Sequence, residues 1–319
     1  MLLDRWCYSF AGLAFVAALG IAAFSPQPYL VQVVVWTALN LLLAASLRIM
    51  LLVGEVNLGV GGFFGIGAYT AALLCVNTGM PTLLAILAGA IVAILISLPF
   101  GFVTLRVSGH YFMLISFALT EILRLVYTRS AALGGNSGIV GIDPGSSAFP
   151  VVVIAIVATG FVALLLAERS HLGRIFRAIA QNDSMVRAVG ISVGSVKLLC
   201  FVISSAAAGL AGASFAYANT VIAPGDFGFI LPVFALAAVK IGGESHPVGV
   251  VIGTIILSAL SQIMISLGAQ DTLLYGAAIL FTMLVMPEGV IGMARKLLVE
   301  RQSPAAQAAP TVRPSGARP

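Results

Sequence analysis

Apolar runs long enough to cross a lipid bilayer recur along this chain, and the short segments between them hold most of its charges. Of the 319 residues, 60% are hydrophobic and 8% are charged. A soluble domain has about a quarter of its residues charged, and it does not repeat apolar runs of about 17 to 25 residues. The sequence therefore predicts an all-α, polytopic transmembrane helical bundle.

About ten spans are predicted, and some are short because glycine indicates a broken or half-spanning helix. The first span, which follows Arg5, also resembles a secretory signal, whose removal would leave the other nine in the same orientation. Together the spans form one transmembrane domain over residues 1–300, and the Pro- and Ala-rich segment 301–319 is predicted to be a disordered tail. The spans cover approximately 7–24, 29–53, 62–77, 82–104, 110–127, 148–167, 197–220, 228–241, 248–267 and 271–287.

Lys and Arg residues fall almost entirely on one side of these spans. Cytoplasmic loops of membrane proteins are enriched in these residues. With both termini placed in the cytoplasm, only Arg124 and Arg129 lie toward the outside. The other fourteen lie inside: Arg5, Arg48, Arg106, Arg169, Arg174, Arg177, Arg187, Lys197, Lys240, Arg295, Lys296, Arg301, Arg313 and Arg318. Membrane topology thus explains the net charge of +5, and no basic run interleaved with aromatic residues indicates nucleic-acid binding.

The sequence lacks the motifs of common catalytic and nucleotide-binding sites. None of its three lysines lies in the Gly-Lys-Ser/Thr of a phosphate-binding loop, because each is followed by Leu or Ile. Charged residues sit mostly at span ends, whereas an intramembrane enzyme would group its catalytic residues at one depth. The histidines and cysteines are scattered singly, without metal or redox spacing: His110, His171, His246, Cys7, Cys75 and Cys200. We expect transport, with no enzyme activity, metal or cofactor in this chain.

An ion-gradient-driven secondary carrier, acting without an ATPase, is the alternative form of transport. Glu55 or Glu121 could then carry a proton. Such a carrier more often places its acidic residue near mid-span, whereas both of these are predicted near span ends. Glu121 and Arg124 are three residues apart on one helix and are predicted to pair. Lys240 is predicted to extend toward the lipid headgroups.

A glycine-rich segment, "GEVNLGVGGFFGIGAYTAALL", covers residues 54–74. Six glycines in its first fourteen residues disfavour a regular helix. Irregular backbone at membrane depth is tolerated where it lines a cavity or is buried in protein. Two interpretations stay open: close helix packing through small residues, or a translocation path. For the path, the candidate residues are Glu55, Asn57, Gly59 and Gly61, because a broken helix offers backbone groups to a zwitterion.

Two short helices are predicted in the segment 170–191. Ser170 can cap the first, and Asn182 or Asp183 can cap the second, which Gly190 would end in a left-handed conformation. Leu172, Ile175, Phe176 and Ile179 recur at helical spacing and form an apolar stripe. From the residues alone, this stripe fits equally a helix lying in the membrane surface and a docking element for a soluble protein.

Three blocks of sequence resemble one known family, the permease subunits of ATP-driven importers for branched-chain amino acids. They are "NLGVGGFFGIGAYTAALL", "YFMLISFALTEILRLV" followed by "GGNSGI", and "LGRIFRAIAQNDSMVRAVGISVGSVKLLCFVISSAAAGLAGASFA" followed by "IGG". The M-type subunit is more similar than the H-type. The resemblance implies a multi-pass protein of the bacterial inner membrane that forms half of the path for leucine, isoleucine, valine or a related small amino acid or amide. It implies four kinds of partner: a second homologous permease, two cytoplasmic ATP-binding subunits, a periplasmic or lipid-anchored binding protein and the lipid bilayer.

The resemblance also favours docking for the segment 170–191, which is similar to the family's coupling segment. In that segment a helix and the glycine after it engage the cytoplasmic ATP-binding subunit, and Gly190 matches this glycine. "MVRAVG" lacks the Glu-Ala-Ala that precedes this glycine in the broad importer pattern, and "GGNSGI" differs from the usual Gly-Gly-Ser-Asn-Gly order. The implied ATPase-coupling residues are Leu172, Gly173, Arg174, Phe176, Arg177, Asp183, Arg187 and Gly190.

Overall fold

The computed structural model describes residues 15–22, 27–145, 149–244 and 246–266, with the single residues 276 and 292. Within these residues, six helices are each long and apolar enough to cross a membrane: α2 (Pro28–Leu51), α3 (Val60–Thr78), α4 (Thr82–Thr104), α5 (His110–Arg129), α6 (Phe149–Arg169) and α9 (Val193–Asn219). They match the second to seventh predicted spans and confirm a polytopic helical bundle. The first and tenth predicted spans lie mostly outside the described residues, so the number ten stays a prediction.

The eighth and ninth predicted spans form a sharply bent pair. α10 (Ile230–Gly242) and α11 (Pro247–Ser266) meet at 116° across a short break. Three glycines allow the two helices to touch near this bend, since a Cβ on Gly242 would overlap the Gly249 carbonyl and one on Gly253 would overlap that of Ala238. α10 has 13 residues, too few to span a bilayer alone. Its length is compatible with the broken or half-spanning helices that the sequence predicts.

Helices α2, α3 and α9 form the centre of the bundle, and α4, α5 and α6 expose most of their surface. α3 and α9 approach so closely that a Cβ on Gly67 would overlap the Gly209 carbonyl, and one on Gly212 would overlap that of Phe64. The expectation that the glycines break the helix is therefore wrong for α3, which is regular from Val60. The helical break lies before it, in the linker 52–59. Close packing offsets the low helix propensity of these glycines.

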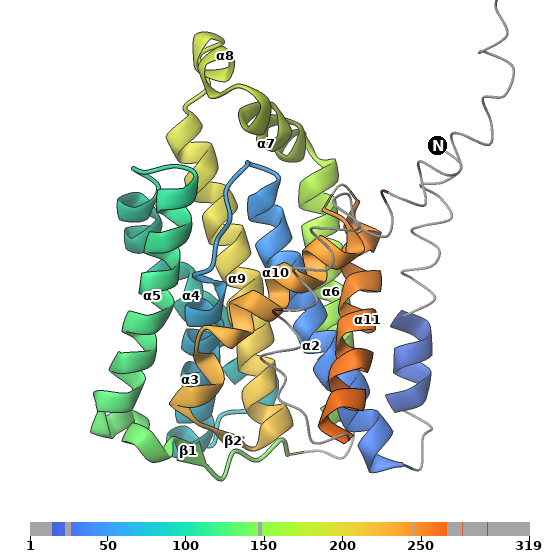
Figure 1. The fold of residues 1–319 in the computed structure, drawn as a ribbon. Helices are drawn as coiled ribbons and strands as arrows, with labels where there is room; N and C mark the ends of the chain where they lie inside the picture. Colours follow the sequence, from blue (N-terminus) through green and yellow to red (C-terminus); the bar gives the residue numbers. More distant parts are fainter. Residues whose placement is uncertain are drawn as a thin grey trace, which may run out of the picture.

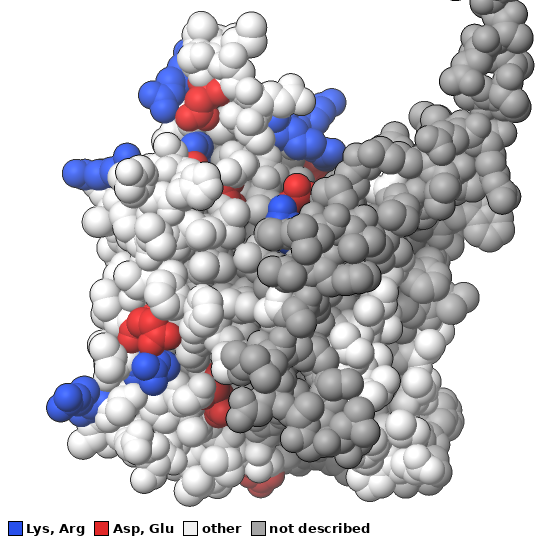
Figure 2. All heavy atoms as spheres, viewed as in Figure 1, with Lys and Arg blue, Asp and Glu red and all other residues white. Residues whose placement is uncertain are grey.

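The two ends of the bundle differ in structure and in charge. Two short helices, α7 (His171–Gln181) and α8 (Asp183–Ala188), cover one end (Figure 1). The opposite end holds a two-stranded antiparallel sheet, β1 (Ile139–Val140) with β2 (Val221–Ile222), and three 3-10 turns, Ala131–Leu133, Gly135–Ser137 and Pro224–Phe227. Lys and Arg gather at the α7–α8 end, and a smaller charged group lies low on the α5 side (Figure 2). This asymmetry agrees with the predicted distribution of basic residues.

Candidate functional site: the α7–α8 loop and its ion-pair networks

Local capping interactions define α7 and α8 where the sequence predicts them. The Ser170 hydroxyl accepts a hydrogen bond from the Leu172 amide (3.2 Å), and the Asn182 side-chain oxygen accepts one from the Met185 amide (3.2 Å). Gly190 has φ +88°, a left-handed conformation that favours glycine. The caps and the predicted terminating glycine are thus all confirmed.

The apolar stripe of α7 is covered by this chain itself. Phe176 is fully buried and Ile179 nearly so, and Gly54 of the linker 52–59 lies against the last turn of α7. The outer surface of the loop is formed instead by α8 and the residue after it: Met185 of α8 is 70% exposed and Val189 is 79% exposed. This chain covers Phe176 and Ile179 and partly buries Leu172 and Ile175, so the most exposed apolar residues of the loop are Met185 and Val189.

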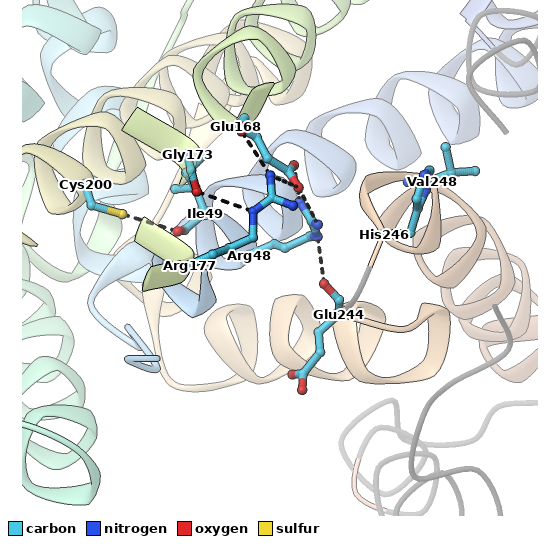
Figure 3. A network of polar contacts seen from close by, with 9 residues as sticks. All are labelled: Arg48, Ile49, Glu168, Gly173, Arg177, Cys200, Glu244, His246 and Val248. Carbon is cyan, nitrogen blue, oxygen red and sulfur yellow. Dashed lines mark hydrogen bonds and ion pairs between the residues drawn. The ribbon is translucent and has the colours of Figure 1, made fainter. Parts of the chain in front are cut away.

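A first ion-pair network fixes α7 to the bundle (Figure 3). Arg48 of α2 binds Glu168 of α6 through both terminal nitrogens, at 2.6 and 3.0 Å, and its Nε donates to the Glu244 carbonyl at 3.2 Å. Arg177 of α7 donates from Nη2 to the Glu168 carbonyl (3.1 Å) and from Nε to the Gly173 carbonyl (3.3 Å). Both Arg48 and Glu168 are buried. The network therefore joins α2, α6 and α7 to the turn between α10 and α11.

A second ion-pair network connects α8 to the linker. Lys197, in the first turns of α9, lies 3.0 Å from Oε1 of Glu55 and 3.6 Å from Oδ2 of Asp183, which also pairs with Arg187 at 3.5 Å. The other oxygen of Glu55 accepts the Gly109 amide at 2.8 Å. One lysine thus ties α8, α9 and the linker together, and Glu55 extends the connection to the start of α5.

The backbone of the linker is satisfied by polar side chains of α5. The Leu58 amide donates to the Ser116 hydroxyl (3.0 Å), and the Thr120 hydroxyl donates to the Leu58 carbonyl (2.9 Å). Asn57 accepts the Gly59 amide at 2.9 Å. Non-helical backbone within a membrane protein needs such internal partners because lipid supplies none. α5 therefore holds this irregular segment in one conformation.

The four candidate path residues lie in this linker or at its junction with α3, and all are packed inside the chain. Glu55 and Asn57 are buried, and the Asn57 side-chain nitrogen has no hydrogen-bond partner among the described residues. A Cβ on Gly59 would come within 2.9 Å of the Asn57 oxygen, and one on Gly61 within 2.9 Å of Pro232 in α10. These contacts support the packing interpretation for both glycines.

The candidate coupling residues fall into an inner and an outer group. Phe176 and Gly173 face inward, and a Cβ on Gly173 would overlap the Glu168 carbonyl. Arg174, Arg177, Arg187 and Gly190 are exposed. Leu172 and Asp183 are partly buried between the groups. The inner residues, together with the polar contacts of Arg177 and Asp183, hold the loop on the bundle, while the exposed side chains are accessible to a second protein.

Sequence reasoning missed three residues of these networks: Arg48, Glu168 and Lys197. Arg48 could have been noticed as the single charge within the apolar run 28–51. Its partner could not, because Glu168 lies 120 residues away, and Glu55 lies 142 residues from Lys197. Within the described residues, no group of His, Cys, Asp and Glu could hold a metal ion.

Comparison with known proteins supplies the family. Residues 29–286 match the family described as branched-chain amino acid transport system, permease component. The high-affinity branched-chain amino acid transport system permease protein LivM of Escherichia coli (strain K12) is 28% identical, over 84% of this chain and 71% of that protein. The corresponding protein LivH of Salmonella typhimurium is 31% identical, over 76% of this chain and 87% of that protein. No solved structure matches.

These relatives are named as permeases of a multi-component transport system, which disfavours both an enzyme and a carrier that acts alone. The match extends from the start of α2 past the end of α11, and so includes the α7–α8 loop and the linker 52–59. This multi-pass membrane protein belongs to the family of permease components of branched-chain amino acid transport systems.

Proposed function

We propose that this chain is one of two permease subunits of an ATP-driven importer in the bacterial inner membrane, with both termini in the cytoplasm. It pairs with a second homologous permease and forms half of the path for leucine, isoleucine, valine or a related small amino acid or amide. Two cytoplasmic ATP-binding subunits supply the energy, and a periplasmic or lipid-anchored binding protein delivers the substrate. The names of the relatives support the substrate class.

The observation that carries the proposal is the link between the exposed α8 and the buried linker. Asp183 and Glu55 both contact Lys197, so a displacement of α8 changes the charge environment of a residue at the start of α9. The same displacement affects Glu55 through Lys197, and Glu55 lies in the linker that connects α2 with α3. The α7–α8 loop therefore has the connections that a coupling segment needs: an accessible outer surface and buried ionic contacts to several spans.

The first network supplies a second route for the same movement. Arg177 ties α7 to Glu168, and Arg48 ties Glu168 to α2 and to the α10–α11 turn. ATP-driven closure of the partner subunits would press on α7 and α8 and shift the spans between two arrangements. Such a switch is biased only by contacts that differ between the two states, and these ionic contacts are candidates for that difference.

Reconstitution with purified partners tests the proposal. Amino-acid uptake into vesicles should require ATP, both permeases, the ATP-binding subunits and the loaded binding protein, because this chain has no phosphate-binding loop of its own. Vesicles that lack one component at a time are the controls. Uptake by this chain alone, driven by a proton or sodium gradient, would contradict the proposal.

A further inference from the structure

An ion pair lies partly exposed on the surface of α5. The Arg124 Nε and the Glu121 Oε2 are 2.7 Å apart, and the two side chains are 38% and 27% exposed. Glu121 is eleven residues after the start of α5 at His110, which places it about 16 Å along a helix about 30 Å long. Glu121 therefore lies near the middle of the helix, and Arg124 lies one turn closer to its end at Arg129. Over α5, Figure 2 shows red and blue atoms side by side, with uncharged surface above them.

Exposed charges at this depth do not face lipid chains. Ionisable residues within spans face the protein interior or a water-filled cavity, because burial in hydrocarbon is costly. The exposed face of α4 shows the contrast, since its outward residues are all apolar: Leu83, Leu84, Leu87, Ile91, Leu95, Leu98, Phe102 and Val103. The side of α5 that carries the pair must therefore border water or a second protein.

Contacts with the segment before α10 show which side this is. The rings of Phe117 and Phe229 meet edge to face at 5.0 Å, and a Cβ on Gly228 would lie 3.4 Å from the Arg124 side chain. Phe117, Glu121 and Arg124 thus form one stripe of α5, directed toward the start of α10. Phe229 is itself 48% exposed, so the stripe and this ring share one open surface.

Hydrogen-bonding capacity remains free in the pair. Within the described residues, the side-chain hydrogen bonds of Glu121 and Arg124 use only Oε2 and Nε. A guanidinium has five N–H donors, and a carboxylate can accept on both oxygens. The pair can therefore bind one further anionic group and one further cationic group side by side.

We propose that Glu121 and Arg124 bind the zwitterionic head of an α-amino acid as it passes through the path. The Arg124 guanidinium binds the substrate carboxylate, and the Glu121 carboxylate binds the substrate ammonium. The exposed Phe229 and the neighbouring Phe117 offer an apolar surface to an aliphatic side chain. The inference rests on the proposed function and extends it by naming the residues of this chain that contact the substrate.

The test uses the full complex in vesicles and compares Glu121→Gln and Arg124→Gln with native protein. Uptake of leucine, isoleucine or valine per ATP hydrolysed should fall about tenfold or more in each variant, since a hydrogen bond to a charged group is lost. Arg124→Lys, which keeps the charge, should recover part of the loss. Arg129→Gln is the matched control, because Arg129 ends the same helix outside the stripe.

Normal uptake per ATP in both Gln variants would overturn the inference, as would a drop in assembled complex with normal uptake per complex. If neither Gln variant assembles, the reversed pair Glu121→Arg with Arg124→Glu decides. It keeps an ion pair but exchanges the two binding groups, so low uptake supports substrate contact and full uptake contradicts it. Native complex that transports none of the three amino acids would instead count against the proposed function.

Discussion

Lys197 and Glu55 form a buried ion pair although 142 residues separate them in the sequence. Their side chains are 11% and 4% exposed, and Nζ lies 3.0 Å from Oε1. A buried ion pair adds little net stability compared with apolar residues, because desolvation offsets the attraction between the charges. Its value here is positional: it holds the linker 52–59 against the first turns of α9, where Asp183 of α8 reaches the same lysine.

Replacing Lys197 with Met should therefore lower the stability of the chain and uncouple ATP hydrolysis from uptake. Removing one partner leaves the Glu55 carboxylate buried and uncompensated, which costs about 3 to 5 kcal/mol. The double variant Glu55→Gln with Lys197→Met removes both charges and should recover most of the stability. We expect its uptake per ATP to stay low, because α8 has lost its ionic contact with α9. Thermal unfolding in detergent measures the first effect, and vesicle uptake measures the second.

Lys240→Met is the matched control for this experiment. Lys240 pairs with Glu244 at 2.7 Å, but these side chains are 29% and 52% exposed. An exposed pair contributes about 1 kcal/mol or less, so this variant should differ little from native protein. A Lys197→Met variant as stable and as well coupled as Lys240→Met would show that the second network has no part in coupling.

Charged substitutions at apolar residues of the α7–α8 loop should have two different effects, on docking at exposed positions and on folding at buried ones. Val189→Asp adds a charge to the exposed tip of α8, so the chain should fold normally and retain less ATP-binding subunit on purification. Phe176→Asp places a carboxylate in a fully buried site, which disfavours folding itself. Val140→Asp, 64% exposed at the opposite end, is the control. Full retention of the ATP-binding subunit by Val189→Asp would contradict docking at α8.

The sequence predicts the spans, the caps of α7 and α8 and the left-handed Gly190 because these depend on composition and on residues a few positions apart. Contacts between residues far apart in the sequence could not be predicted in this way. Nothing in the local pattern shows that Arg48 binds Glu168, or that Phe176 packs inward and leaves Val189 open. The glycines of α3 illustrate the same limit, since their effect depends on how closely α9 approaches. Composition indicates an irregular segment, but only the packing shows that it ends before Val60.

Topology can be tested by cysteine labelling at two exposed positions near the opposite ends of the bundle. In a variant without native cysteines, a cysteine at Asn136 should react with an impermeant reagent from outside, and one at Ser184 only from inside. The excess of Lys and Arg at the α7–α8 end predicts that this end faces the cytoplasm. Both residues are exposed and outside the ion pairs, so neither substitution should disturb the fold. Labelling of both cysteines from the same side would contradict a crossing of the membrane by α6, which lies between them.

Gly190→Val tests the conformation of the loop without touching the bundle. Gly190 has φ +88° and open space around its Cα, so a valine meets no neighbour but is forced into a conformation that costs about 1 to 3 kcal/mol. The turn after α8 should shift, and with it the exposed tip at Val189. Membrane insertion should be normal, because the spans are held by packing elsewhere.

Gly194→Val is the control, since Gly194 also has open space but lies in helix α9 without a positive φ. We expect weaker retention of the ATP-binding subunit, or hydrolysis without uptake, for Gly190→Val alone, and equal behaviour of the two variants would exclude a coupling role for this turn.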